Sequence, residues 1–168
     1  MTDDIPKRAF APVVDRRTRV LILGSLPGDR SLGAGEYYAH PSNAFWWLMG
    51  EVLGDPGLLG APYSMQLSRL LDRGIGLWDV IGSGRRTGSL DSAIRDASPR
   101  DVPGFAASLP QLQAIAFNGG LAARHGRRQV GYPASLQFID LPSSSAAHAG
   151  IPRTGKLAAW REIYNFLG

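Results

Sequence analysis

The sequence predicts an α/β protein, specifically a three-layer α/β/α sandwich around a central, mostly parallel sheet of about four strands. Short continuous apolar runs, typical of buried parallel strands, alternate with longer segments whose apolar residues recur at helical spacing. Each apolar run is followed by a loop rich in glycine, proline or serine. The 168 residues suit one domain. We therefore expect a single domain over residues 1–168, with residues 1–18 as an irregular lead-in.

The expected strands are short and apolar. The clearest is Val20–Leu23, an unbroken aliphatic run that a parallel sheet would bury on both faces. The other expected strands are Ile75–Ile81, Ala114–Phe117 and Leu136–Leu141. Because the carboxyl ends of parallel strands meet at one edge of a sheet, we expect the loops that follow these strands to form the functional site.

Helices are expected between the strands. Asn43–Leu53 carries apolar residues at helical spacing and is followed by the helix breakers Gly54 and Pro56. Further helices are expected over Tyr63–Gly74, over Ser89–Arg95, in a segment ending near Leu109, over Leu121–Arg128 and over Lys156–Leu167. Glycine and serine favour loops over Gly24–Gly35 and Gly82–Ser89.

Charge and composition narrow the function classes. The net charge is +4, and sixteen of the eighteen basic residues are arginines, which suits either a polyanionic partner or a solvated arginine-rich surface. Without cysteines the chain has neither disulfides nor thiolate zinc sites. The acidic start lacks the apolar region of a signal peptide, and no apolar run is long enough for a membrane span. We therefore expect a cytoplasmic protein that does not enter a membrane.

Several ligand motifs are absent. Gly24–Gly35 lacks the glycine spacing of a dinucleotide-binding turn. The run Gly150–Lys156 has the glycines and lysine of a phosphate-binding loop, but Leu157 replaces the magnesium-binding hydroxyl. The three histidines share no ligand spacing, and no nucleophile elbow occurs. We expect no metal and no cofactor, and the polar, aromatic loops suit a flat hydrogen-bonding ligand such as a nucleobase.

Three motifs resemble those of the uracil-DNA glycosylase superfamily, nearest to its mismatch-specific and hypoxanthine-DNA glycosylase branches. They are Gly24-Ser-Leu-Pro-Gly28, Tyr38-Ala-His-Pro-x-Asn43-x-Phe-Trp46 and Leu141-Pro-Ser-Ser-Ser145. The resemblance implies a monofunctional, monomeric glycosylase of base excision repair. Such an enzyme flips a deaminated base out of DNA and hydrolyses its N-glycosidic bond, leaving an abasic site. Uracil and hypoxanthine are the first candidate bases, and xanthine is a further one.

The sequence departs from the family pattern at two positions. Leu26 stands where the family has a water-orienting Asp or Asn, and Leu141 stands where it has a His or Asn that supports the leaving base. Asn43 is the first candidate to replace the former, although it also suits a helix N-cap. Asp29 is a less favoured general base and also suits an N-cap. His148 is the candidate to replace the latter, with an ordinary surface histidine as the alternative.

The resemblance also implies contacts to the base and to DNA. Tyr38 is expected to stack on the flipped base, with core packing as the alternative, and Asn118 to read the base, with turn formation as the alternative. The remaining expected base-binding residues are Gly24, Ser25, Leu26 and Phe45. Expected DNA contacts come from serines and from basic residues; the basic residues equally suit a solvated surface, and Ser31 also suits a helix N-cap. The expected contact residues are Ser31, Arg85, Arg86, Ser143, Ser144, Ser145, Arg153 and Lys156.

Two other function classes remain open at this stage. A damaged-DNA-binding protein with the same fold would lack the water-activating group. A small nucleotide or nucleoside hydrolase would use the same sheet edge without binding DNA.

Overall fold

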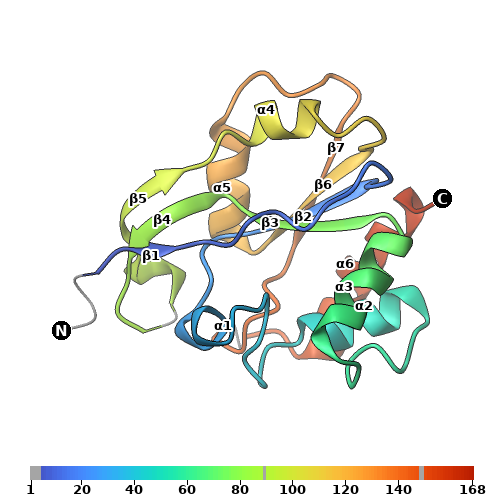
Figure 1. The fold of residues 1–168 in the computed structure, drawn as a ribbon, viewed down its shortest axis with the longest axis horizontal. Coiled ribbons are helices and arrows are strands. Elements are labelled where there is room, and N and C mark those ends of the chain that lie inside the picture. Colours follow the sequence, from blue (N-terminus) through green and yellow to red (C-terminus); the bar gives the residue numbers. More distant parts are fainter. Residues whose placement is uncertain (1–4, 89, 148–149) are drawn as a thin grey trace.

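A four-stranded, all-parallel sheet forms the centre of the protein (Figure 1). The computed structural model describes residues 5–88, 90–147 and 150–168. The strand order is β3-β2-β6-β7. The strands are β2 (Val20–Gly24), β3 (Ile75–Asp79), β6 (Ala114–Asn118) and β7 (Gln137–Leu141). The four strands predicted from the apolar runs are therefore confirmed, and their carboxyl ends lie at one edge.

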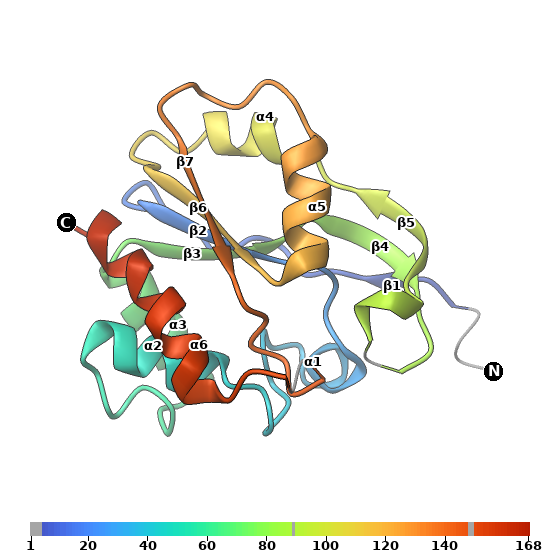
Figure 2. The same cartoon turned by 180° about the vertical axis from the view of Figure 1, so that it is seen from behind.

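Helices cover both faces of this sheet, as Figures 1 and 2 show from opposite sides. One face carries α2 (Phe45–Leu53), α3 (Tyr63–Asp72), α6 (Arg153–Trp160) and the 3-10 helix η3 (Arg161–Phe166). The other face carries α4 (Val102–Ala107) and α5 (Gly120–Arg128). The predicted three-layer α/β/α sandwich is thus confirmed.

The aliphatic run of β2 supplies both halves of the core. Val20 and Ile22 belong to the cluster beneath α2, α3 and α6, while Leu21 and Leu23 belong to the cluster beneath α4 and α5. All four are fully buried. Alternate strand residues point to opposite faces, so an unbroken apolar run is what a strand covered on both sides requires.

A second, antiparallel sheet was not predicted. Its strands are β1 (Lys7–Arg8), β4 (Ile81–Arg85) and β5 (Arg95–Pro99), in the order β1-β4-β5. The predicted loop Gly82–Ser89 and the predicted helix Ser89–Arg95 are therefore wrong in part, since only Asp91–Ala93 forms a short 3-10 helix, η2. The glycine-rich β4 lacks strand propensity, but its small residues let the chain at the start of β5 pass close by: a methyl group on Gly84 would lie 3.3 Å from Ile94 and 3.5 Å from the Arg95 carbonyl oxygen.

A short helix replaces part of the predicted loop Gly24–Gly35. Helix α1 spans Asp29–Ala34 and ends at Gly35, whose φ of 68° is accessible to glycine at little cost. Ser31 is its buried residue, and the Ser31 hydroxyl accepts a hydrogen bond from the Ala39 N–H at 3.0 Å. This contact ties α1 to the following loop, a tertiary interaction that local propensity does not report.

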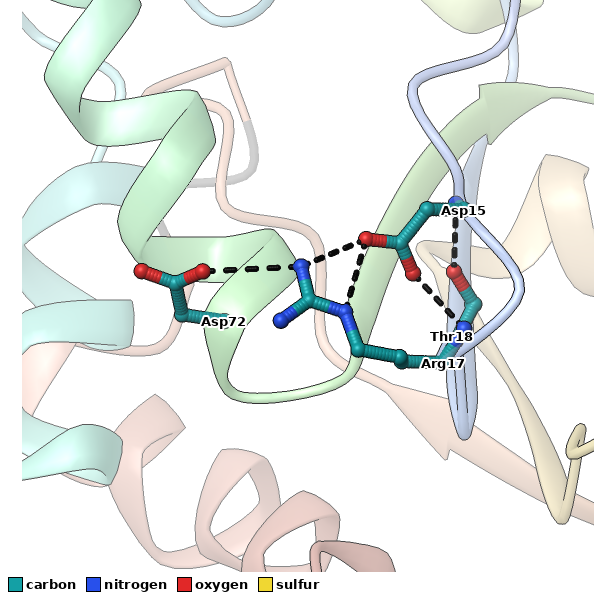
Figure 3. A network of polar contacts seen from close by, with 4 residues as sticks. All are labelled: Asp15, Arg17, Thr18 and Asp72. Atoms are coloured by element: carbon teal, nitrogen blue, oxygen red, sulfur yellow. Dashed lines mark hydrogen bonds and ion pairs between the residues drawn. The ribbon is translucent and has the colours of Figure 1, made fainter.

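At the opposite, amino-terminal edge of the sheet, an exposed polar network fixes the entry into β2 (Figure 3). The Arg17 guanidinium donates to Asp15 at 2.7 Å and reaches Asp72 at the end of α3 at 3.5 Å. The Asp15 N–H donates to the Thr18 hydroxyl. Exposed ion pairs of this kind contribute about 0–1 kcal/mol, so the network sets geometry more than stability.

No helix in the described parts of the chain is both long and apolar enough to cross a membrane.

Candidate active site

A cavity of about 590 Å³ lies at the carboxyl edge of the parallel sheet. Its wall includes the turn Gly24–Gly28 after β2, Asp79 at the end of β3, Asn118 at the end of β6 and the loop 143–147 after β7. The loop 38–43 contributes Tyr38, His40, Ser42 and Asn43. The structure therefore brings together the strand-end loops that the sequence placed at one edge, in a volume suited to a small ligand.

Asp79 lies in this wall and was missed by the sequence analysis. It is only 4% exposed, and its Oδ2 is buried without a hydrogen-bond partner in the part of the chain that the structure describes. Burial raises the pKa of Asp79 to about 7. The charges of Arg100 and Arg86 oppose this rise, and the negative charge of Asp91 adds to it. Its position at the end of a predicted strand was the available signal, because that is where open α/β sheets bind ligands.

Gly24 leaves room for the side chains of Asp79 and Tyr38. Gly24 and Asp79 are partners in the parallel ladder between β2 and β3. A methyl group on Gly24 would lie 2.6 Å from Asp79 Oδ1 and 3.2 Å from the Tyr38 hydroxyl oxygen. No larger residue fits there without displacing one of these groups. Gly24 is thus a point of close approach in the cavity wall, and its contact with a base stays a prediction.

Tyr38 presents its ring to the cavity. The ring stacks on that of Phe45, with centroids 3.9 Å apart and planes 15° from parallel. Its hydroxyl is buried without a partner among the described residues, and burial raises its pKa. Tyr38 has a φ of 56°, a strained conformation for a non-glycine residue that is often found at functional sites. Phe45 is fully buried and supports Tyr38 from behind, so its predicted direct contact with a base is wrong.

Arg86 locks the turn after β2. Its Nη2 donates to the carbonyl oxygens of Pro27 at 2.8 Å and Leu26 at 3.3 Å. Its Nη1 lies 3.6 Å from Asp91, which accepts a hydrogen bond from the Ser25 hydroxyl at 2.7 Å. Arg86 is 1% exposed, so the alternative of a solvated surface residue is wrong, and its contact with a phosphate stays a prediction. Buried charges require this kind of pairing, and here the pairing fixes the shape of the turn.

Asn118 holds the loop that follows β7. Its amide nitrogen donates to the Ser144 hydroxyl, and its amide oxygen accepts from the Ser144 N–H, both at 2.9 Å. The Ser144 carbonyl oxygen in turn accepts from the Ala44 N–H before α2. Asn118 therefore positions the loop, and its predicted reading of a base stays a prediction.

Asn43 bonds to the start of α2 and also lines the cavity, and its role in orienting water stays a prediction. Its side-chain oxygen accepts from the Phe45 N–H at 3.0 Å at the start of α2, and the residue also lines the cavity. Asp29 is exposed, forms an ion pair with Lys7 and is not part of the cavity wall that the described residues form. Its predicted role as a general base is therefore wrong in this geometry. His148 lies outside the described residues.

The predicted DNA contacts separate into several groups. Ser143, Ser144 and Ser145 line the cavity, as does the buried Ser31. Arg153 is exposed and lies over the Trp47 ring, 4.4 Å from its centroid. Arg85 pairs with Asp96 at 3.5 Å, and the buried Lys156 donates to the Ser145 carbonyl oxygen at 3.3 Å.

Two exposed arginines at the cavity were missed. Arg30 lies on α1 and Arg124 on α5, and both line the wall while remaining exposed. Each falls on a helix that follows a strand-end loop, which is the only signal the sequence carried for them. Their position at an open cavity suits contacts with phosphate oxygens.

This fold is that of a known class. Residues 11–165 match the uracil DNA glycosylase superfamily, so the chain belongs to that superfamily, as its motifs predicted. It is 38% identical over 160 residues to a hypoxanthine DNA glycosylase of Methanosarcina acetivorans, covering 94% of this chain and 98% of that protein. A hypoxanthine DNA glycosylase of Methanosarcina barkeri is 36% identical over 160 residues, again covering 94% of this chain and 98% of that protein.

A solved structure has the same fold. The solution NMR structure of a candidate uracil DNA glycosylase from Methanosarcina acetivorans superimposes with a TM-score of 0.80 at 36% identity. The match covers 95% of this chain and 97% of that one.

Proposed function

We propose that this protein excises hypoxanthine from DNA as a monofunctional glycosylase, with uracil and xanthine as further substrates. Membership of the superfamily makes it a DNA N-glycosylase for deaminated bases. The observation that supports this choice of site is the cavity at the sheet edge, which has room for a base and has an aromatic side chain and residues with buried polar atoms in its wall. We further propose that it acts as a monomer.

Base binding follows from the wall of the cavity. Extruding a nucleotide costs a few kcal/mol, least for a mispaired base, and stacking inside the pocket offsets this cost. The exposed part of the Tyr38 ring provides the stacking surface, and Phe45 stacked behind it keeps that ring in place. The strained backbone of Tyr38 is consistent with a residue held for binding.

The turn Gly24–Gly28 supports departure of the base. As the N-glycosidic bond breaks, negative charge develops on the base, and fixed backbone N–H groups stabilise it more in the transition state than in the ground state. The hydrogen bonds from Arg86 to the carbonyl oxygens of Leu26 and Pro27 keep this turn rigid. Such preorganisation avoids reorganisation during the reaction.

Asn43 is the candidate for orienting water. Its amide oxygen has a second lone pair besides the one that receives the Phe45 N–H, and its NH₂ group can donate. An amide positions water without taking a proton, so Asn43 can compensate for Leu26, whose side chain has no polar atom.

Labelled duplexes test this proposal. Oligonucleotides with one hypoxanthine, uracil or xanthine are incubated with excess protein and then cleaved with alkali, beside an undamaged duplex of the same sequence. Alkali-labile product from the hypoxanthine strand, and none from the control, supports the proposal. Binding without product would indicate a damaged-DNA-binding protein, and turnover of free nucleosides alone would indicate a small-molecule hydrolase. The molar mass of the free protein, measured by light scattering, tests whether it is a monomer.

A further inference from the structure

Two side chains that line the cavity each have a buried polar atom without a hydrogen-bond partner among the described residues, namely Asp79 Oδ2 and the Tyr38 hydroxyl oxygen. Both side chains lie beside Gly24, since a methyl group there would be 2.6 Å from Asp79 Oδ1 and 3.2 Å from the Tyr38 hydroxyl oxygen. A buried polar group without a hydrogen bond costs about 1–3 kcal/mol, so native proteins rarely leave one without a functional reason. Both residues line the cavity, so a bound ligand can reach them.

The charged groups around Asp79 are committed elsewhere. Arg100, which follows β5, donates to the Asp79 backbone oxygen at 3.4 Å and to the Phe10 carbonyl oxygen at 2.7 Å. Arg86, which follows β4, is engaged by the turn after β2 and by Asp91 of η2. No ion pair to Asp79 occurs within residues 5–88, 90–147 and 150–168. The carboxyl group is thus buried without a counter-ion among the described residues.

We infer that Asp79 in its protonated form binds the N–H and C=O edge of the flipped base, donating its O–H to the carbonyl oxygen and accepting the ring N–H. This inference rests on the proposed glycosylase function and names the group that binds the base. Hypoxanthine, uracil and xanthine all carry an N–H beside a C=O, the edge that deamination creates. A carboxylic acid matches it with one donor and one acceptor.

The same contact assists the reaction. When the C1′–N bond breaks, the electron pair leaves with the base and part of its negative charge develops on the carbonyl oxygen that Asp79 contacts. Water supplies the hydroxyl group to C1′ and a proton to the departing base. A donor at that oxygen becomes stronger as the charge grows, whereas an ionised carboxylate would repel it. Asp79 thus supports the leaving base, which Leu141 cannot do because its side chain has no polar atom.

The predicted pH dependence has a definite sign. Asp79 acts when protonated, and burial raises its pKa to about 7, with Arg100 and Arg86 opposing and Asp91 adding to the rise. Excision is therefore expected to be maximal below that pH and to fall about tenfold per unit above it, as for any single required proton. A carboxylate that activated water would give the opposite slope.

Two substitutions at Asp79 distinguish these roles. Single-turnover excision of hypoxanthine from a duplex is measured between pH 5.5 and 8.5 for the natural protein, Asp79→Asn and Asp79→Ala, with pH values chosen to bracket the pKa of about 7. Asp79→Asn keeps a donor and an acceptor but does not titrate, so it is expected to stay within about tenfold of the maximal rate and to lose the fall above pH 7. Asp79→Ala is expected to lose about ten- to a hundredfold.

The control is Asp72→Asn, an exposed carboxylate at the opposite edge of the sheet, which is expected to behave as the natural protein. Thermal unfolding establishes that each variant is folded. If Asp79→Asn is as inactive as Asp79→Ala while the natural rate rises with pH, Asp79 activates water and the inference is wrong. The inference would also be wrong if Asp79→Ala excised hypoxanthine at the rate of the natural protein.

Binding of free hypoxanthine separates this inference from the proposed function. Calorimetric titration at pH 6 and pH 8 is expected to show weaker binding at the higher pH for the natural protein, and equal binding at both for Asp79→Asn. A protein that excises no base but shows this pattern would refute the glycosylase proposal and support the role of Asp79. Binding that is insensitive to pH in the natural protein would contradict the role of Asp79 alone.

Discussion

Asn118 and Ser144 hold each other through two reciprocal hydrogen bonds of 2.9 Å, which join the end of β6 to the loop after β7. The pair is buried. Through the Ser144 carbonyl oxygen it also holds Ala44 at the start of α2. One amide thus connects two of the loops that surround the cavity.

Asn118→Ala and Ser144→Ala are each expected to lower the free energy of unfolding by about 1–3 kcal/mol, because each leaves buried partners unsatisfied. The double variant should cost less than the sum of the two, since the shared interaction is lost only once. Denaturant unfolding of all four proteins measures this cycle. Additive losses would show that the two residues act independently.

Arg86→Met is expected to loosen the turn after β2. Loss of the bonds to Leu26 and Pro27 should reduce stability by about 3 kcal/mol and slow excision at a temperature where the variant is folded. Arg153→Met removes an exposed arginine and should leave stability nearly unchanged. Chemical denaturation and single-turnover assays measure both variants. Equal stability of the two would contradict a structural role for the buried guanidinium.

Asn43 has a capping role and a proposed role in orienting water, and two substitutions separate them. Asn43→Ala should cost about 1 kcal/mol of stability by losing the acceptor for the Phe45 N–H, and should slow excision by about a hundredfold or more. Asn43→Asp keeps that acceptor at a helix N-terminus, so stability should be retained. If Asn43→Ala excised hypoxanthine at the natural rate, Asn43 would be only a cap.

Tyr38 is expected to act through its ring. Tyr38→Ala should weaken base binding by about 1–3 kcal/mol, the usual contribution of one stacked base. Tyr38→Phe keeps the ring and removes a buried hydroxyl that has no partner among the described residues, so excision should stay within about tenfold. Single-turnover rates at saturating protein make the comparison. A similar loss in both variants would shift the role of Tyr38 from the ring to the hydroxyl.

Arg124 is expected to bind a phosphate at the rim of the cavity. Arg124→Gln should lower the slope of log affinity against log salt by about 1, and should weaken binding equally for damaged and undamaged duplexes. Fluorescence anisotropy over a range of salt concentrations measures the slope. Arg17→Gln, at the opposite edge of the sheet, is the matched control and should leave the slope unchanged.

The sequence determined the elements whose signal is local. The unbroken apolar run of β2 follows from burial on both faces, and the motif residues at the strand ends indicated the family and the edge of the sheet that carries the cavity. The strands β4 and β5 escaped prediction because their residues have weak strand propensity and their pairing comes from the tertiary fold.

Only the tertiary structure decided which polar residues face the cavity and how burial and neighbouring charges shift their pKa values. The sequence pointed to Asp29 and not to Asp79, yet Asp79 is buried in the cavity wall and Asp29 pairs with Lys7 at the surface. Arg86 and Arg124 differ in the same way, one locked beneath a turn and the other exposed at the cavity. Desolvation and hydrogen bonding depend on neighbours distant in the chain, so their effects on charge and pKa arise only once the chain has folded.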